Sequence, residues 1–265
     1  MEVLLAQLCP VAGDVPANAE RVADVVRNNP GADLAVFPEL FLSGYDLAQA
    51  PSLALEAGAA EIDPVRNAAA ETGTAVIVGF VERGAAGAVH NSVLVVDAAG
   101  AVAAVYRKLQ LFGAERDAFD PGDQLLVVSL AGSRVGLLIC FDAEFPELAR
   151  ALAAKGAQML VTTAANMRPY YGDHELATRA RALDNRRPHV YVNRVGTEAG
   201  MQFVGGSRVI APDGTVRMQF PEQDEAVSIA TVVLSEEDDE AVQYLAQVPE
   251  RFPVRLIDSV LRGST

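Results

Sequence analysis

The chain has 265 residues, of which 51% are hydrophobic, which is enough for a substantial core and too many for an intrinsically disordered chain. Its 35 acidic and 21 basic residues give a formal net charge of −14, which argues against nucleic-acid binding because such a site needs clustered lysine and arginine. With only Cys9 and Cys140, a disulfide framework is not expected.

Short apolar runs alternate along the chain with segments of helical periodicity. Helices are predicted over roughly 16–28, with Asp14 as its cap, and over 61–72, 145–155 and 174–187. A further helix is predicted to start at Ser235, where "SEEDDE" places acidic residues in a first turn. Strands are predicted at 3–8, 34–37, 75–81, 92–96, 101–106, 125–128, 135–139, 159–161, 190–192, 204–210, 215–219 and 227–233.

Several of these strands are apolar throughout, which is typical of strands that are buried on both faces. Turn signals at 97–100 and 212–214 predict two β-hairpins. The order strand, helix, strand and hairpin recurs weakly in each half, and no flexible linker interrupts it. We therefore expect residues 1–265 to form a single α/β domain, with sheet layers covered by helices.

The stretch "RVGLLICFDAEFPEL", residues 134–148, places Cys140 where an apolar strand ends. Strand ends in α/β folds often carry reactive groups on a rigid scaffold. If a helix begins near residue 145, its free amides would lower the pKa of the thiol and stabilise an oxyanion. Cys140 is therefore a candidate nucleophile, and a buried structural cysteine is the alternative for this stretch. Cys9, before Pro10, is interpreted as structural.

A nucleophilic thiol needs a base, and the histidines of this chain have no recognisable partners. Glu39 in "LAVFPELFLSGY" follows an apolar strand and is surrounded in sequence by apolar residues. Burying a carboxylate among such residues costs free energy unless it has a charged partner, so Glu39 is a candidate for the base. Lys108 in "VYRKLQLFGAERDAFDPGD" ends a strand pattern, with Glu115 seven residues later. A lysine near Glu39 and Cys140 would favour their ionised forms and stabilise an oxyanion.

Glu39, Lys108 and Cys140, each at a strand end and in this order, resemble the Glu-Lys-Cys triad of the nitrilase superfamily of carbon-nitrogen hydrolases. The matching segments are "FPELFLSGY", "YRKLQLFG" and "CFDAEFPE". The resemblance continues through "RARALDNRRPHVYVNRVG" and "FVGGSRVIAPDG", so it covers nearly the whole chain. Glu115 matches the second, structural glutamate that members place after the lysine loop.

The resemblance implies a four-layer α-β-β-α sandwich that commonly dimerises through helices, so we expect a homodimer. It also implies hydrolysis without a cofactor, in which Glu39 takes the thiol proton as Cys140 attacks a carbonyl carbon. Lys108 and the backbone amide of Phe141 would hold the oxyanion, and ammonia would leave from an acyl-thioester. Glu39 would then activate water, while Glu115 orients Lys108 or the substrate nitrogen.

The substrate is predicted less closely than the triad. A small carboxamide is the first expectation, and a nitrile, an N-carbamoyl amide or acyl transfer to an amine would use the same triad. Arg168 is the candidate partner for a carbamoyl acid's carboxylate, and Tyr171 could help to cover a ligand, although an ordinary loop fits residues 162–175 equally well. The candidate pocket residues are Tyr45, Asn166, Met167 and Tyr170.

Two other classes of protein are alternatives to a carbon-nitrogen hydrolase. A non-catalytic scaffold protein is disfavoured because burying charged side chains costs folding free energy, which is hard to explain without a catalytic role. The residues concerned are Glu39, Lys108, Glu115 and Cys140. A dinucleotide-binding module is rejected, because "FVGGSR" lacks the complete G-x-G-x-x-G pattern between a strand and a helix.

The sequence also predicts a cytoplasmic protein with a small-molecule substrate and no metal, nucleic-acid or membrane partner. It begins Met-Glu-Val without a basic leader region, and its apolar runs are too short to span a bilayer. His90, His174 and His189 lack the paired spacing of metal ligands.

Overall fold

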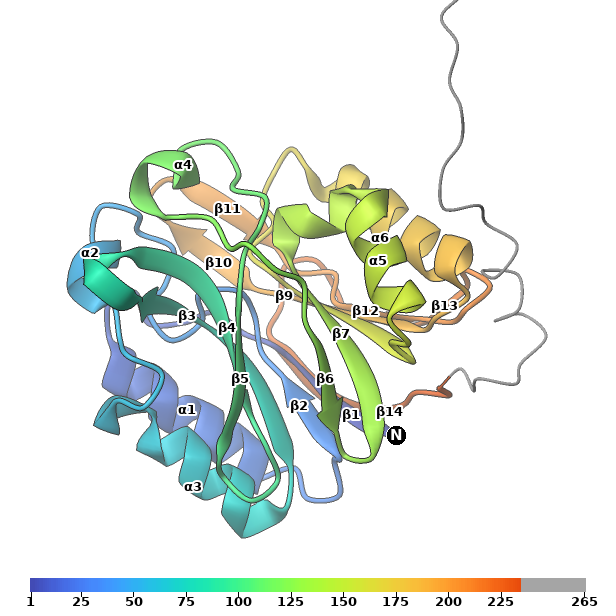
Figure 1. Cartoon of the computed structure of the whole chain (residues 1–265), viewed down its shortest axis with the longest axis horizontal. Helices are drawn as coiled ribbons and strands as arrows, with labels where there is room; N and C mark the ends of the chain where they lie inside the picture. The colour runs from blue at the N-terminus through green and yellow to red at the C-terminus, as the bar shows by residue number, and fades with distance from the viewer. Residues whose placement is uncertain (235–265) are drawn as a thin grey trace, which may run out of the picture.

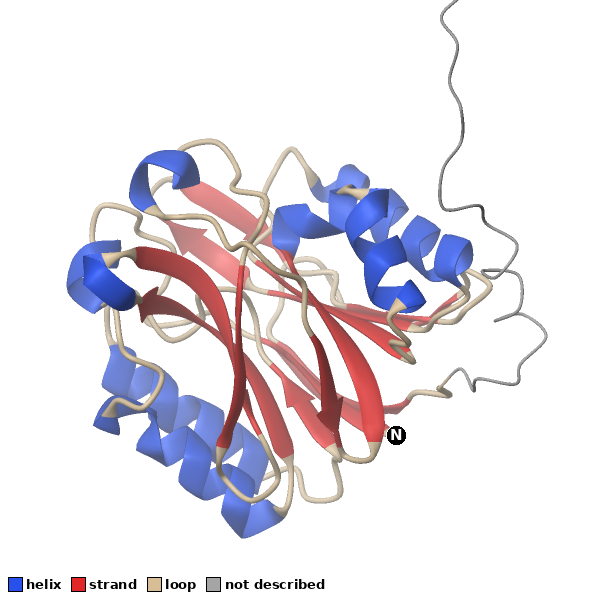
Figure 2. Ribbon diagram, viewed as in Figure 1, coloured by secondary structure: helices blue, strands red, loops and turns tan. Residues whose placement is uncertain are grey.

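The apolar runs form two six-stranded sheets that pack face to face in the computed structural model, which describes residues 1–234 (Figures 1 and 2). The first sheet has the order β14-β1-β2-β3-β4-β5 and the second the order β13-β12-β9-β8-β7-β6. The strands of the first are β1 (Glu2–Gln7), β2 (Leu34–Val36), β3 (Ala75–Arg83), β4 (Val89–Val96), β5 (Val102–Arg107) and β14 (Ala226–Thr231). Those of the second are β6 (Val127–Leu130), β7 (Ser133–Ile139), β8 (Met159–Ala164), β9 (His189–Asn193), β12 (Arg208–Ile210) and β13 (Val216–Gln219).

The two sheets repeat one pairing pattern, as the weak symmetry of the sequence suggested. In the first sheet β1, β2 and β3 are parallel, β4 pairs antiparallel with β3, and β5 pairs antiparallel with β4. In the second sheet β7, β8 and β9 are parallel, and β12 and β13 continue in the same antiparallel manner. The hairpins predicted at 97–100 and 212–214 connect β4 to β5 and β12 to β13.

Helices cover the outer face of each sheet, which gives the four-layer α-β-β-α sandwich that the resemblance implied. In Figure 1 α1 (Val15–Arg27) and α3 (Asp63–Thr72) lie on one side, and α5 (Pro146–Ala154) and α6 (Tyr171–Asn185) lie on the other. Short elements fill the connections: α2 (Ala50–Leu53), α4 (Glu115–Ala118) and the 3-10 turns η1 (Ala60–Ile62), η2 (Ala85–Gly87) and η3 (Cys140–Glu144).

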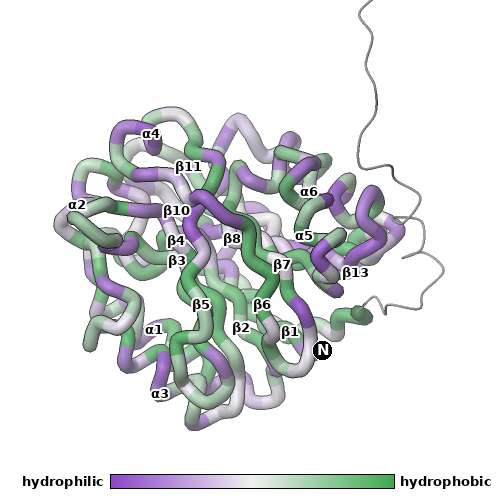
Figure 3. Tube along the Cα trace, in the orientation of Figure 1, coloured by the Kyte–Doolittle hydropathy of each residue, from purple (hydrophilic) through white to green (hydrophobic). Residues whose placement is uncertain are grey.

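Burial on both faces explains why the central strands are apolar throughout. In β1, Val3 and Leu5 pack between the sheets, while Leu4 faces α1 and α3. In β7, Leu137 packs between the sheets and Leu138 packs against α5. The central strands are accordingly mostly hydrophobic along their length in Figure 3, whereas the outer helices alternate with hydrophilic residues.

The structure corrects part of the strand prediction. The run 204–210 is two strands, because Gly205 and Gly206 both have positive φ, of 44° and 67°, and break the ladder. Its first part belongs to a separate hairpin of β10 (Val195–Glu198) and β11 (Met201–Val204), which the sequence did not predict. Asp14 caps α1 as expected, by accepting a bond from the amide of Ala17 at 3.1 Å. The helix predicted at Ser235, and the end of the single domain predicted for 1–265, lie outside the described residues, so both stay predictions.

Candidate active site

Glu39 lies in a loop that leaves β2 and runs along β3. The Phe37 amide still bonds to Ile77 O at 2.8 Å, and the Gly79 amide bonds to Pro38 O at 3.1 Å. A Cβ atom at Gly79 would lie 2.6 Å from the Cα of Glu39 and 2.5 Å from Pro38 O. Position 79 must therefore be glycine for the loop to lie this close to the strand.

The Glu39 carboxylate is fully buried and accepts three hydrogen bonds. Its Oε1 accepts from Lys108 Nζ and from Asn91 Nδ2, both at 2.7 Å, and its Oε2 accepts from the Ala165 amide at 2.7 Å. These bonds fix the side chain from both sheets, because Asn91 is in β4 and Ala165 follows β8. One lone-pair position on Oε2 remains for a further donor.

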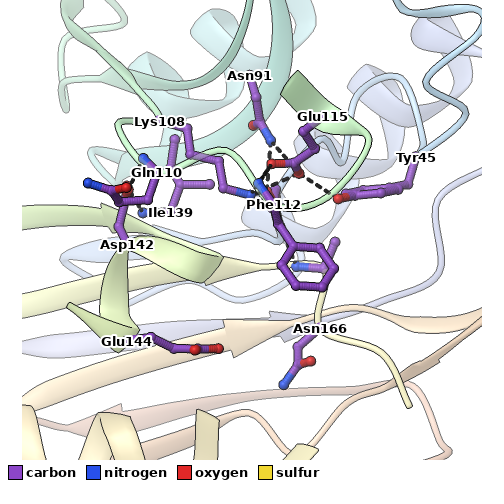
Figure 4. Close-up of polar contacts among 12 residues, drawn as sticks. Tyr45, Asn91, Lys108, Gln110, Phe112, Glu115, Ile139, Asp142, Glu144 and Asn166 are labelled. Atoms are coloured by element: carbon purple, nitrogen blue, oxygen red, sulfur yellow. Dashed lines mark hydrogen bonds and ion pairs between the residues drawn. The ribbon is translucent and has the colours of Figure 1, made fainter. Parts of the chain in front are cut away.

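Lys108 follows β5 and is held by two buried carboxylates, those of Glu39 and Glu115, and Figure 4 shows its contact with Glu115. Its Nζ lies 2.7 Å from Glu39 Oε1 and 2.8 Å from Glu115 Oε2, and all three side chains are fully buried. Burial alone would lower the pKa of Lys108, but the charges of Glu115 and Glu39 outweigh it and raise that pKa well above its ordinary value. The ammonium is therefore the stable form.

Glu115 begins α4 and is positioned by donors from three other segments. Its Oε1 accepts from the Tyr45 hydroxyl and its Oε2 from the Phe112 amide at 2.8 Å. Asn91 Nδ2 also reaches Glu115 Oε1, at 3.4 Å, and so contacts both carboxylates. Sequence reasoning missed Asn91, although three successive polar residues, "HNS" at 90–92, in an otherwise apolar strand were a signal that could have found it.

Cys140 lies where β7 ends and η3 begins, with a positive φ of 48° that is unusual for a residue with a side chain. Burial raises the pKa of the Cys140 thiol well above its ordinary value, and the charge of Glu39 adds to this rise. Lys108 and the Ala165 amide act in the opposite direction but do not prevail. The expectation that helix amides would lower this pKa is therefore wrong, because desolvation and the nearby carboxylate dominate.

Asp142 supports the sharp turn at the cysteine. Its carboxylate is buried and accepts bonds from the Ile139 amide at 3.1 Å, the Gln110 amide at 2.8 Å and the Tyr106 hydroxyl at 2.7 Å. Burial raises the pKa of Asp142 to about 6, although these donors act to lower it. Asp142 therefore joins the lysine loop to the cysteine turn, which is a structural role.

A pocket of about 280 Å³, part of it open to solvent, lies beside Cys140. The predicted pocket residues Tyr45, Asn166, Met167 and Tyr170 all line it. Phe112, Phe141, Glu144, Ala165 and His174 line it as well, and none of these side chains was predicted to belong to the pocket.

Two further candidates lie away from the pocket lining. The guanidinium of Arg168 pairs with Glu222 at 3.1 Å, and the hydroxyl of Tyr171 accepts a bond from Gln219 at 3.0 Å. Cys9 does not line the pocket either.

Within residues 1–234, no group of three or more His, Cys, Asp or Glu residues is arranged to hold a metal ion. In the same part of the chain, none of the helices combines the length and the apolar character needed to cross a membrane.

A four-layer sandwich with a buried Glu-Lys pair next to a pocket that a cysteine lines is typical of a hydrolase of the nitrilase type. The chain belongs to the carbon-nitrogen hydrolase family, whose model matches residues 3–239, and the family and fold expected from the sequence are thereby confirmed. It is a carbon-nitrogen hydrolase that acts on bonds other than peptide bonds.

Individual relatives are amidases and nitrilases. The chain is 40% identical over 219 residues to an (R)-stereoselective amidase of a Pseudomonas species, covering 82% of this chain and 79% of that one. It is 33% identical over 255 residues to a probable nitrilase of Schizosaccharomyces pombe, covering 93% and 94%. A glutamate-to-glutamine variant of the amidase from Nesterenkonia sp. AN1 is similar in structure, with a TM-score of 0.79, 29% identity and coverage of 94% and 97%. That structure carries the acetamide moiety of fluoroacetamide covalently added at the active-site cysteine.

Proposed function

We propose that this protein hydrolyses a small carboxamide to a carboxylic acid and ammonia, without a cofactor, through an acyl-thioester on Cys140. The observation that carries the proposal is the buried group of Glu39, Lys108 and Glu115, hydrogen-bonded to one another beside a pocket that Cys140 lines. The pocket is small, at about 280 Å³ with part of it open to solvent, and this favours a small substrate.

In the acylation step, Glu39 is the base. Because the raised pKa keeps the thiol neutral at rest, a proton must leave as sulfur attacks, and the free lone pair of Glu39 Oε2 can accept it. The new sulfur–carbon bond places negative charge on the substrate oxygen. Glu39 then returns the proton to nitrogen as the carbon–nitrogen bond breaks and ammonia leaves.

Lys108 and the Phe141 amide stabilise the oxyanion. An ammonium has three donors, and Lys108 gives two of them to Glu39 and Glu115, which leaves one for the substrate oxygen. Phe141 is the second residue of η3, where amides have no partner within the turn. Glu115 holds Lys108 in place, so that no reorganisation is needed as charge develops.

Deacylation reverses these roles with water in place of the thiol. Glu39 removes a proton from water, whose oxygen attacks the thioester carbon, and the sulfur–carbon bond then breaks to release the acid. The thiol recovers the proton from Glu39, so the cycle needs only amide and water.

Two alternative substrate classes could react with the same triad, namely carbamoyl acids and nitriles. Carbamoyl acids are disfavoured because Arg168, their candidate partner, pairs with Glu222 and does not line the pocket. Nitrile hydrolysis has the support of a relative named as a probable nitrilase, and the experiment below includes it.

We further propose a cytoplasmic homodimer. The free thiols of Cys9 and Cys140 suit a reducing compartment. On α6 the side chains of Leu176 and Leu183 are 71% and 41% exposed, and their spacing of seven places them on one face of the helix. Light scattering that gives a monomer mass across micromolar concentrations would contradict the dimer.

The function is tested by incubating the protein with small carboxamides, nitriles and N-carbamoyl amides while ammonia and the intact mass are followed. An acyl adduct on Cys140 with carboxamides is expected. Cys140→Ala should abolish turnover and adduct, whereas the control Cys9→Ala should retain both. Full amidase activity in Cys140→Ala would refute the mechanism.

A further inference from the structure

The wall of the pocket beside Cys140 combines aromatic rings with one carboxylate. Phe112 makes edge-to-face contacts with Phe141 and Tyr170, with ring centroids 5.3 and 5.2 Å apart. The three rings thus form a continuous aromatic surface that lines the pocket. Glu144, in the same turn as the nucleophile, lines it too, and its side chain is 30% exposed.

Glu144 is placed to meet a ligand. In Figure 4 its carboxylate points toward the side of the site where Asn166 lies, away from the group around Lys108 and Glu115. Its Oε1 lies 3.3 Å from His174 Nε2, while Nδ1 of the same ring lies 2.9 Å from the Tyr191 hydroxyl. The imidazole is buried and held from both sides, so it can fix the direction of the Glu144 carboxylate.

Neither lysine nor arginine is among the described residues that line this pocket, and the imidazole there, that of His174, already contacts Glu144. Behind the pocket, Glu39 and Glu115 carry two negative charges against the single positive charge of Lys108. A substrate with a carboxylate would therefore be repelled, whereas a cation would gain from Glu144 and from the electron-rich ring faces.

Resting on the proposed amidase function, we propose that the preferred substrates are short carboxamides whose acyl chain carries an ammonium group. Glu144 is the specificity-determining residue: it pairs with the ammonium while the aromatic surface of Phe112, Phe141 and Tyr170 encloses the chain. The small volume of the pocket limits that chain to a few carbons. His174 acts as a positioning residue for Glu144.

The test uses a matched pair of substrates, β-alaninamide and butyramide, which differ by an ammonium in place of a methyl group. The wild-type protein should have a kcat/KM for β-alaninamide about tenfold or more above that for butyramide, and added salt should reduce the difference. Glu144→Gln keeps the shape and removes the charge. Its kcat/KM should fall about tenfold more on β-alaninamide than on butyramide, mainly through KM.

Glu147→Gln is the control variant, because Glu147 is an exposed carboxylate three residues further on that does not line this pocket. It changes the net charge by the same amount and should retain the wild-type preference. Thermal melts of both variants check that they fold.

Two results overturn this inference. Hydrolysis of both amides without a preference for the ammonium, or an equal loss on both in Glu144→Gln, refutes the role of Glu144 and leaves the amidase function standing. Absence of turnover and of any Cys140 adduct with either amide refutes the proposed function itself, and the substrate class with it.

Discussion

Replacing Glu39 by glutamine separates the chemistry of the base from its structural role. Glutamine has nearly the same shape, but its amide offers one oxygen and one NH₂ group where the carboxylate accepts three bonds. If its oxygen faces Lys108 and Asn91, its NH₂ group meets the Ala165 amide, donor against donor. The other orientation sets the NH₂ group against both Lys108 and Asn91.

The size of both effects follows from this arrangement. One unsatisfied buried donor pair should lower the free energy of unfolding by about 1–3 kcal/mol, so Glu39→Gln should remain folded. Loss of a general base typically reduces the rate about 10²–10⁴-fold, and here both acylation and deacylation need it. The activity should therefore fall far more than the stability.

The assay is single-turnover acylation by a small carboxamide, followed by intact mass, alongside thermal unfolding. Alkylation of Cys140 by an α-haloacetamide is the control, because that reaction needs no proton transfer to a leaving nitrogen and reports whether the thiol stays accessible. If Glu39→Gln acylates at the wild-type rate, Glu39 is not the base and the proposed mechanism is wrong.

Three other substitutions probe the surroundings of Glu39. Lys108→Ala should raise the activation barrier for kcat by about 3–4 kcal/mol. It should also lower the free energy of unfolding by about 3–5 kcal/mol, because two carboxylates stay buried without a counter-charge. Full activity in Lys108→Arg would contradict the role assigned to Lys108. Asn91→Ala should lower kcat about tenfold through the lost hydrogen bonds, and Asn91→Asp, which adds a third carboxylate, should lower it further; equal kcat values in both variants would speak against this positioning role. The pKa of Asp142 is raised from 3.8 in the unfolded chain to about 6 in the fold. The protonated carboxyl therefore adds about 3 kcal/mol to the free energy of unfolding below pH 4, and this contribution is lost as the pH rises through 6. Relative to wild type, Asp142→Asn should thus gain about this much unfolding free energy between pH 4 and pH 7 in urea titrations, whereas a constant difference would exclude this titration.

The parts of the site that the sequence could predict are those with local signals. Glu39, Lys108 and Cys140 each follow an apolar run, and strands that end at one edge of packed sheets bring such residues together. The nearly continuous apolar character of the central strands likewise predicted burial on both faces.

The parts that could not be predicted depend on contacts between distant segments. Asn91 bridges Glu39 and Glu115 only because β4 lies next to β3 and β5. His174 appeared to have no partner until the fold brought it to Glu144 and Tyr191. The pKa of Cys140 depends on the balance of burial and charges from three other segments, which the residues next to it in sequence do not contain.

The close approach of the Glu39 loop to Gly79 constrains how this protein can evolve. A β-branched residue would ordinarily favour a strand at position 79, but here it would displace the backbone of residues 38–40. A survey of variants scored by activity alone would therefore rank Gly79 with the reacting groups, although it touches no substrate. A larger residue at position 79 is therefore tolerated only if the loop at 38–40 changes as well, so substitutions in the strand and in the loop are coupled.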